Sequence, residues 1–193
     1  MKKAIVTGIS GQDGAYLAKL LLSNNYKVFG IVRTNLKSFS NLEYLKINNE
    51  IEFVYCDLLN ISAVEKIIND INPDEIYNLA AQSSVFQSYM QPITTFEFNT
   101  ISVFNLIESI KKINPKIKLY QASSSEMFGR VKNLPINEES IIHPVSPYAI
   151  SKVAAHYTCV NYRESYDMFI SCGILFNHES YLRNDGFFVK KVI

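Results

Sequence analysis

Two residues four positions apart, Tyr148 and Lys152, stand in the run Ser-Pro-Tyr-Ala-Ile-Ser-Lys at 146–152. Serine is a good helix cap, and proline is tolerated at the first helical position. A helix that begins at Pro147 would place the Tyr148 and Lys152 side chains one turn apart on the same face. An ammonium group beside a phenol favours the phenolate, which lowers the phenol pKa toward the range of a general base. Tyr and Lys at this spacing are also common on helix surfaces, so the pair alone leaves the function open.

A second cluster, three serines at 123–125 followed by Glu126, comes directly after an apolar run. Serines at a strand end often form turns, and Glu126 could be an ordinary surface carboxylate. If this strand end faces Tyr148 and Lys152, a hydroxyl, a phenol and a carboxylate surround one substrate carbon, which suits hydride transfer coupled to proton abstraction. A simple alcohol dehydrogenase needs only the hydroxyl, Tyr and Lys. The additional Glu indicates a second step that removes a carbon-bound proton.

Glycines at 8, 11 and 14 follow the short apolar run 3–7 and precede an apolar helical pattern. In a strand–turn–helix unit, Gly8 permits the tight turn, Gly11 lets backbone N–H groups approach a pyrophosphate, and Gly14 allows close packing of helix on strand. The positive end of the helix dipole then faces the phosphates. Glycines also end strands for purely structural reasons, but the flanking strand and helix favour dinucleotide binding.

The next strand, 27–32, ends at Arg33 rather than at an acidic residue. A carboxylate there would bind the ribose hydroxyls of NAD, whereas an arginine can pair with the extra phosphate of NADP. Arg33 could instead be a solvated loop charge. We favour NADP, and the polar residues at 34–38 fit either a cofactor loop or a subunit contact.

Strand and helix patterns alternate along the chain, which predicts an α/β fold of the Rossmann-like, doubly wound type, with a parallel sheet between two layers of helices. Strands are predicted at 3–7, 27–32, 51–55, 75–79, 117–122 and 169–175, and helices at 13–24, 61–71, 94–113 and 147–167, with a further helical segment around 39–46. Ligands of such sheets bind beyond the carboxyl ends of the strands. The candidate residues above all fall at these ends.

The composition excludes several classes of protein. With 193 residues, 48% of them hydrophobic, and a net charge of +1, the chain suits a soluble globular domain. Its basic residues are scattered and matched by acidic ones, so we expect no nucleic-acid partner. No apolar run is long enough to span a membrane, and no signal peptide is expected. Cys56, Cys159 and Cys172 are odd in number and outside metal spacing, which indicates reduced core thiols in the cytoplasm and no metal site.

The last residues, 187–193, form an apolar and basic run typical of the beginning of a helix. A domain does not normally stop within such an element, so we expect a carboxyl-terminal portion to be missing. Residues 1–193 are then an NADP-binding Rossmann-like domain, in which segments of a substrate domain begin at about residue 178.

Five motifs, at 7–14, 75–83, 120–129, 146–152 and 173–180, resemble the extended short-chain dehydrogenase/reductases, and among these specifically the GDP-mannose 4,6-dehydratases. Gly-Gln-Asp-Gly together with Phe-Asn-His-Glu-Ser is far more specific than either the glycine or the Tyr–Lys motif. The resemblance covers the entire chain. It implies that a full-length member continues into a smaller domain that holds much of the nucleotide-sugar.

The resemblance also implies an internal redox cycle with bound NADP and a GDP-sugar substrate. Tyr148, helped by Lys152 and the Ser124 hydroxyl, would deprotonate the C4 hydroxyl while hydride leaves C4. Glu126 would remove the C5 proton, water would leave from C6, and hydride would return to C6. The product would be a 4-keto-6-deoxy sugar nucleotide, and the protein would be a dimer or tetramer.

By the same resemblance, several residues would bind the two ligands. The cofactor contacts would be Gly8, Ile9, Ser10, Gly11, Gln12, Asp13, Gly14, Arg33, Asp57, Leu58, Leu79, Ala80, Ala81, Gln82, Ser83, Tyr148, Lys152, His178 and Arg183. The substrate contacts would be Ser83, Ser124, Glu126 and Asn177. His178 could alternatively be an ordinary loop histidine.

Some residues depart from the family pattern: Ser124, Ser84 and Thr94 stand where Thr, His and Tyr are usual. A hydroxyl is kept at Ser124, but the other changes leave a GDP-heptose dehydratase open. A nucleotide-sugar 4-epimerase or 4-reductase is a second alternative, although neither needs Glu126. A non-catalytic NADP-binding fragment is the third.

Overall fold

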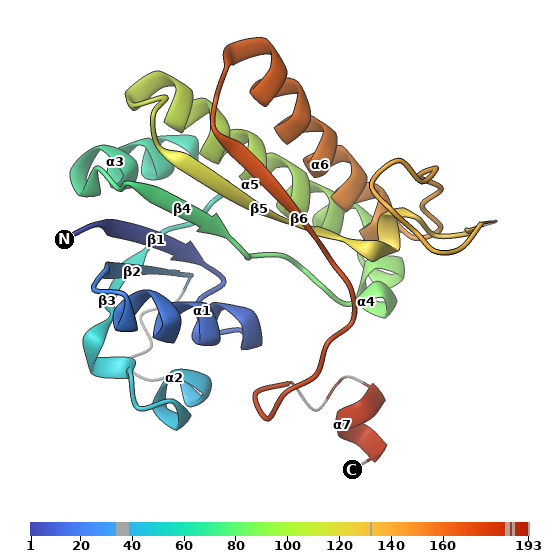
Figure 1. Ribbon diagram of the computed structural model, residues 1–193, viewed down its shortest axis with the longest axis horizontal. Helices are drawn as coiled ribbons and strands as arrows, with labels where there is room; N and C mark the ends of the chain where they lie inside the picture. Colours follow the sequence, from blue (N-terminus) through green and yellow to red (C-terminus); the bar gives the residue numbers. More distant parts are fainter. Residues whose placement is uncertain (34–38, 132, 184–185, 187, 193) are drawn as a thin grey trace.

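A computed structural model describes residues 1–33, 39–131, 133–183, 186 and 188–192, and shows a six-stranded parallel sheet (Figure 1). The strands are β1 (Lys3–Thr7), β2 (Lys27–Val32), β3 (Glu52–Tyr55), β4 (Glu75–Asn78), β5 (Lys118–Ser124) and β6 (Ile170–Leu175). Their order is β3-β2-β1-β4-β5-β6, which is the Rossmann order and confirms the predicted fold class. The order reverses between β1 and β4, so a ligand crevice is expected there. The polar stretch predicted to contact a cofactor or a subunit, 34–38, lies outside the described residues.

Helices cover both faces of the sheet (Figure 1). One layer holds α1 (Gln12–Ser23) and α2 (Ser40–Tyr44); the other holds α3 (Ile61–Ile71), α5 (Pro92–Ile113) and α6 (Pro147–Tyr166). Three short elements were not predicted: α4 (Val85–Met90) and the 3-10 turns η1 (Asn48–Glu50) and η2 (Ser125–Met127). The predicted terminal helix is present as α7 (Phe188–Val192). Helix α4 has six residues, too few to show a helical period, and begins where the Ser84 hydroxyl accepts a hydrogen bond from the Gln87 amide.

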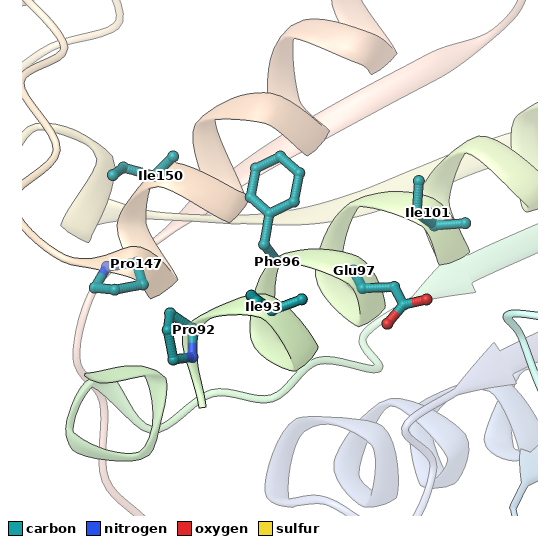
Figure 2. Close-up of a pocket in the computed structure, with 7 residues that line it drawn as sticks. All are labelled: Pro92, Ile93, Phe96, Glu97, Ile101, Pro147 and Ile150. Carbon is teal, nitrogen blue, oxygen red and sulfur yellow. The ribbon is translucent and has the colours of Figure 1, made fainter. Parts of the chain in front are cut away.

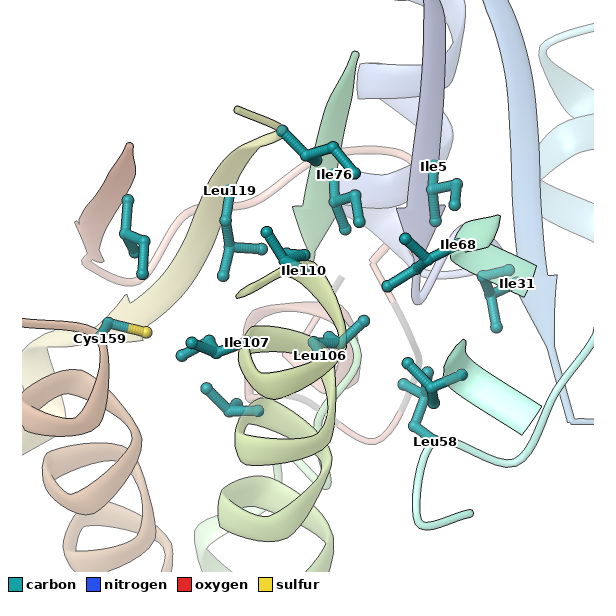
Figure 3. Packing of buried hydrophobic residues seen from close by; sticks show 14 of the residues in the cluster. Ile5, Ile31, Leu58, Ile68, Ile76, Leu106, Ile107, Ile110, Leu119 and Cys159 are labelled. Carbon is teal, nitrogen blue, oxygen red and sulfur yellow. The ribbon is translucent and has the colours of Figure 1, made fainter. Parts of the chain in front are cut away.

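The core has two layers, because successive side chains of a strand point to opposite faces of the sheet. Ile5 of β1 packs with Ile68 of α3 and Ile107 of α5, and Figure 3 shows this layer between the sheet and the helices. The neighbours of Ile5 in the strand pack on the other face, against α1. Leu182, which follows β6, is buried in this second layer, so the chain returns from the last strand to the first helix.

Helix α6 begins as its sequence predicts. The Ser146 hydroxyl accepts a hydrogen bond of 3.1 Å from the Ala149 amide, and Pro147 occupies the first turn. This cap fixes the start of the helix and so the side of it that faces the sheet, on which Tyr148 and Lys152 are both buried. Among the helices formed by the described residues, none is both long and apolar enough to cross a membrane.

Candidate active site

The glycine loop between β1 and α1 is packed as closely as its motif predicts. Gly8 has φ +67°, and a Cβ atom there would lie 2.8 Å from the Ala80 nitrogen of the loop after β4. A Cβ atom on Gly14 would lie 2.3 Å from the Gly8 carbonyl oxygen. Only glycine permits both approaches, so the loop, the helix and the end of β4 form one compact unit.

This unit suits the pyrophosphate of a dinucleotide. Helix α1 begins after Gly11 without a side-chain hydrogen bond to cap it, so its first-turn amides can face an anion. Ser10 and Gly11 are exposed beside these amides. Ile9 is different, because its side chain is fully buried in the core. Ile9 was predicted to contact the cofactor, and it could therefore do so only through its main-chain atoms.

A buried polar chain joins the glycine loop to α6, and sequence reasoning missed it. The Thr7 hydroxyl accepts hydrogen bonds from the Leu79 and Ala80 amides and donates one of 2.6 Å to Asn78 Oδ1. Asn78 Nδ2 donates to Gln121 Oε1 at 2.7 Å, and Gln121 Nε2 in turn donates to the Ala122 carbonyl. That carbonyl also accepts a hydrogen bond of 3.0 Å from Lys152 Nζ. This chain of hydrogen bonds holds the ends of β1, β4 and β5 in register.

Two asparagines of α5 hold other loops at this edge of the sheet. Asn99 accepts a hydrogen bond from the Gln82 amide and donates to the Gln82 carbonyl, and it also donates to the Ser151 hydroxyl of α6. Asn105 Nδ2 donates to the Leu58 carbonyl at 2.9 Å. The Leu58 side chain is buried in the core, so this predicted cofactor residue, like Ile9, has only its main chain available.

The four predicted catalytic residues lie together where β5 ends. The Ser124 hydroxyl and the Glu126 carboxylate both lie near enough to the Tyr148 phenol to act on its pKa. Lys152 Nζ lies 5.9 Å from the centroid of the Tyr148 ring. Glu126 is held by the turn η2, in which its amide donates to the Ser124 hydroxyl. A hydroxyl, a phenol, an ammonium and a carboxylate thus converge.

The pKa of Tyr148 differs in direction from the sequence expectation. Burial raises it, the neighbouring Ser124 hydroxyl lowers it in part, and the Glu126 charge raises it further. Lys152 does not reverse this rise: its ammonium donates to the Ala122 carbonyl, so part of its charge is directed at the backbone. The expectation that Lys152 brings the phenol pKa down is therefore wrong for the protein alone, because burial dominates.

Lys152 itself is strongly perturbed: burial lowers its pKa from 10.5 to about 8. A shift of this size corresponds to about 3 kcal/mol of disfavoured charge in the folded protein. At neutral pH, the buried charge of Lys152 therefore lowers the free energy of unfolding, although the residue is part of the candidate active site.

Replacing Lys152 by Met should raise the free energy of unfolding at pH 7 by roughly 1–2 kcal/mol, since the lost hydrogen bond offsets part of the relieved burial of charge. Above pH 8, the unfolded wild-type chain binds more protons than the folded one, so wild-type stability rises with pH and the difference from the variant shrinks. Urea unfolding between pH 6.5 and 10 measures both effects. Exposed Lys66→Met is the control, expected within about 0.5 kcal/mol of wild type at all pH values. A destabilised Lys152→Met variant at pH 7 would contradict the argument.

His178 connects the segment after β6 to the start of α1. Its Nδ1 lies 2.8 Å from the Phe176 carbonyl and its Nε2 lies 2.6 Å from Asp13 Oδ1. Both partners accept, so the doubly protonated ring satisfies both, and the contact with Asp13 raises the pKa of His178. The Ser180 hydroxyl adds a hydrogen bond to Gln12 Oε1. The predicted cofactor residues of the first helix and of this segment therefore meet.

The remaining predicted residues lie around the same edge. Asp57, Ser83 and Asn177 are exposed at the ends of β3, β4 and β6. Arg33 follows β2, with its guanidinium carbon 5.2 Å from the centroid of the Phe98 ring. Arg183 is partly buried and lies 3.6 Å from the Glu179 carboxylate. No predicted site residue falls at the opposite edge of the sheet.

Comparison with known proteins agrees with this arrangement. A family model described as GDP-mannose 4,6 dehydratase matches residues 5–193. The GDP-mannose 4,6-dehydratase of Yersinia enterocolitica is 41% identical over all of this chain and 54% of its own length. The human GDP-mannose 4,6 dehydratase is 40% identical over 98% of this chain and 53% of its own length. The chain thus spans about half the length of these curated relatives.

Solved structures share the fold. A dTDP-glucose 4,6-dehydratase from Streptomyces venezuelae, solved with NAD bound, superposes with a TM-score of 0.86 at 20% identity, over 98% of this chain and 60% of that one. A UDP-glucose 4-epimerase from Thermotoga maritima, solved with UDP-glucose, superposes with a TM-score of 0.79 at 26% identity, over 88% of this chain and 54% of that one.

Proposed function

The chain belongs to the GDP-mannose 4,6-dehydratase family, and on this premise we propose that its protein converts a GDP-sugar, GDP-mannose in the first place, to the 4-keto-6-deoxy product. The reaction is a net loss of water, so the enzyme is a hydro-lyase. A bound nicotinamide cofactor would supply the reversible hydride transfer that oxidation at C4 and reduction at C6 require. The residues of the glycine loop, of the first turn of α1 and of the loop at 79–83 would hold this cofactor.

The side chains supply the proton transfers. Tyr148 accepts the proton of the C4 hydroxyl, and the neighbouring Ser124 hydroxyl, which lowers the Tyr148 pKa, favours the phenolate at that moment. Lys152 carries positive charge toward the phenol from the same helix face. The ketone at C4 acidifies the C5 proton, which Glu126 removes, and water leaves from C6.

One observation carries this proposal: the Glu126 carboxylate lies near enough to Tyr148 to act on its charge. A base beside the phenol is what elimination adds to simple oxidation. A 4-epimerase or 4-reductase would use the Tyr148 and Lys152 pair without it. A GDP-heptose substrate would use the same residues, and the exposed Asn177 and Ser83 would contact the sugar nucleotide in either case.

Incubation of the whole protein with GDP-mannose and NADP tests the proposal. The product should absorb in alkali as a 4-keto sugar, with no net build-up of reduced cofactor. In deuterated water, one solvent deuteron should appear at C5. Stoichiometric reduced cofactor, or a C4 epimer as product, would instead indicate a reductase or an epimerase. A GDP-heptose run in parallel, converted faster than GDP-mannose, would reassign the substrate.

The cofactor proposed for this site is NADP. Arg33 follows β2, where the adenosine ribose of a dinucleotide binds in this fold, and its exposed guanidinium can pair with the additional phosphate. Arg33→Ala should weaken NADP binding roughly 10- to 100-fold and leave NAD binding unchanged, since a charge-assisted pair contributes about 1.5–3 kcal/mol. Titration calorimetry with both cofactors measures this. Equal losses for NADP and NAD would contradict it.

Family membership also supports a homo-oligomer, and the chain offers a face for it. A groove of about 570 Å³ between α5 and α6 is lined mainly by apolar side chains (Figure 2): Pro92, Ile93, Phe96, Ile101, Pro147 and Ile150. The Ile93 side chain is 81% exposed. A second copy of the chain would cover this face and bury it.

Thiols kept reduced in such a protein suit the cytoplasm, where we place it.

Ile93→Asp should shift the wild-type oligomer toward monomer in sedimentation velocity at micromolar concentration, because a carboxylate would be buried in the interface. Ile141→Asp, a change at an equally exposed isoleucine outside the groove, is the control and should leave the mass unchanged. A monomeric wild type, or equal effects of the two variants, would overturn this assembly.

A further inference from the structure

Helix α5 contacts the chain where three strands end. Asn99 holds the main chain of the loop after β4, and Asn105 holds the main chain of the loop after β3. Phe98, which precedes Asn99 in the helix, reaches the end of β2, because the Arg33 guanidinium carbon lies over its ring, 5.2 Å from the ring centroid. One helix therefore supports the part of the crevice over β2 and β3, where the adenosine half of a dinucleotide binds in this fold.

The two side chains of this contact differ in how firmly they are held. Phe98 is partly buried and packs against the core layer that α3 and α5 form with the sheet. Its carbonyl also accepts a hydrogen bond from the Ser102 hydroxyl, one turn further along α5. Arg33 is exposed at the end of β2 and has a long side chain with many rotamers. The ring is thus the fixed partner, and it restricts the positions of the guanidinium.

A contact with an aromatic ring leaves the guanidinium able to bind an anion. The ring attracts the positive charge through its quadrupole, within about 6 Å of the centroid, and needs no hydrogen bond from the N–H groups. Those N–H groups can therefore still form the fork of parallel hydrogen bonds that suits two oxygens of a phosphate. A carboxylate partner would instead occupy them, and a phosphate would have to displace it. Phe98 holds the cation of Arg33 without competing for its donors.

We propose that Phe98 is a positioning residue for cofactor selection: it holds the Arg33 guanidinium at the crevice before the cofactor binds, and so sets how strongly the protein prefers NADP to NAD. This inference rests on the proposed pairing of Arg33 with the additional phosphate of NADP. A side chain that is already held near its bound position loses less conformational freedom when the ligand arrives. NAD has no such phosphate, so its binding gains nothing from the arrangement.

Titration calorimetry of the whole protein with NADP and with NAD tests the proposal. Phe98→Leu keeps an apolar side chain against the core but removes the ring. It should weaken NADP binding roughly two- to five-fold, the size of a cation–π contact at an exposed site, and leave NAD binding unchanged. Phe98→Tyr keeps the ring face and should bind NADP as wild type does. Phe104→Leu, the same change at a phenylalanine of α5 whose ring contacts Tyr162, is the control and should alter neither affinity.

A double variant distinguishes failure of this inference from failure of the NADP site itself. In the Arg33→Ala background, Phe98→Leu should cause no further loss of NADP affinity, because the ring acts through the arginine. If Arg33→Ala leaves NADP binding unchanged, the proposed phosphate site is wrong. If Arg33→Ala weakens NADP binding but Phe98→Leu does not, or if the two losses add in the double variant, only the role of Phe98 is wrong. Equal losses of NADP and NAD in Phe98→Leu would also overturn a role in selection.

A measurement on the wild-type protein without cofactor needs no change at Phe98. In a proton–nitrogen correlation spectrum, the Arg33 Nε–H signal is identified by its disappearance in Arg33→Ala. It should lie upfield of the other arginine Nε–H signals, because the ring current of Phe98 shields protons above the ring. A signal at the ordinary position would show that the guanidinium does not rest on the ring in solution. That result would overturn the proposal even where Phe98→Leu fails to fold.

Discussion

Glu126→Gln should lower the rate of dehydration by roughly 10²–10⁴-fold, the range that a positioned general base contributes. Glutamine keeps the shape of the side chain but cannot accept the C5 proton. Oxidation at C4 needs only Tyr148, Ser124 and Lys152, so this first half-reaction should survive. With GDP-mannose, the variant should therefore accumulate reduced cofactor on the protein, seen as nicotinamide absorbance in a single turnover. Solvent deuterium should no longer enter C5.

Tyr148→Phe is the matched control, since it removes the phenol and leaves Glu126 in place. It should lose both the reduced-cofactor signal and deuterium exchange, because oxidation precedes elimination. Glu126 is only partly buried, so its replacement should leave the melting temperature close to that of wild type. Normal turnover of Glu126→Gln would remove the basis for the dehydratase mechanism. Loss of both half-reactions in Glu126→Gln would make the carboxylate a partner of Tyr148 rather than the C5 base.

The elements of the sheet could be predicted because local patterns specify them. Apolar strands that alternate with helices carrying an apolar face are compatible with few folds. Helix starts are marked by local geometry, at Ser146 and Pro147 for α6 and at the three glycines for α1. The predicted boundaries of β5 failed because Ser123 and Ser124 are polar residues that continue a strand. The Ser123 hydroxyl contacts His156, and the Ser124 hydroxyl lies near enough to Tyr148 to act on its pKa; both partners lie far along the chain. The polar residues at this strand end serve contacts with residues that are distant in the sequence. Local strand propensity does not include such contacts.

The polar chain from Thr7 to Lys152 was beyond sequence reasoning for a related reason. Thr7, Asn78 and Gln121 are ordinary polar residues in the sequence, and their meaning comes from strand register, which pairs Thr7 with Asn78 and Asn78 with Gln121. Buried polar groups need partners, so the three form one network. The direction of the Tyr148 pKa was missed because it depends on burial, which spacing on a helix does not reveal.

Gly14→Ala should destabilise the protein by about 3 kcal/mol, the upper part of the usual cost of overpacking. The added Cβ atom would lie 2.3 Å from the Gly8 carbonyl oxygen and 2.6 Å from the Ile9 Cα atom. Both are backbone atoms, so no side-chain rotation can relieve the contact. Alanine gains about 1 kcal/mol of helix propensity, which is too little to compensate. For a chain of this size, the melting temperature should fall by roughly 6–12 °C.

Gly11→Ala is the control, because Gly11 has φ −73° and a Cβ there would meet the Gly8 oxygen at 3.2 Å on an exposed loop. Its stability should stay within about 1 kcal/mol of wild type. Any shift that relieves Gly14→Ala must move the first turn of α1 away from Gly8, so binding of NADP should weaken in parallel with stability. A Gly14→Ala variant as stable as wild type would show that α1 can separate from the loop, and that close packing there is not what positions the anion site.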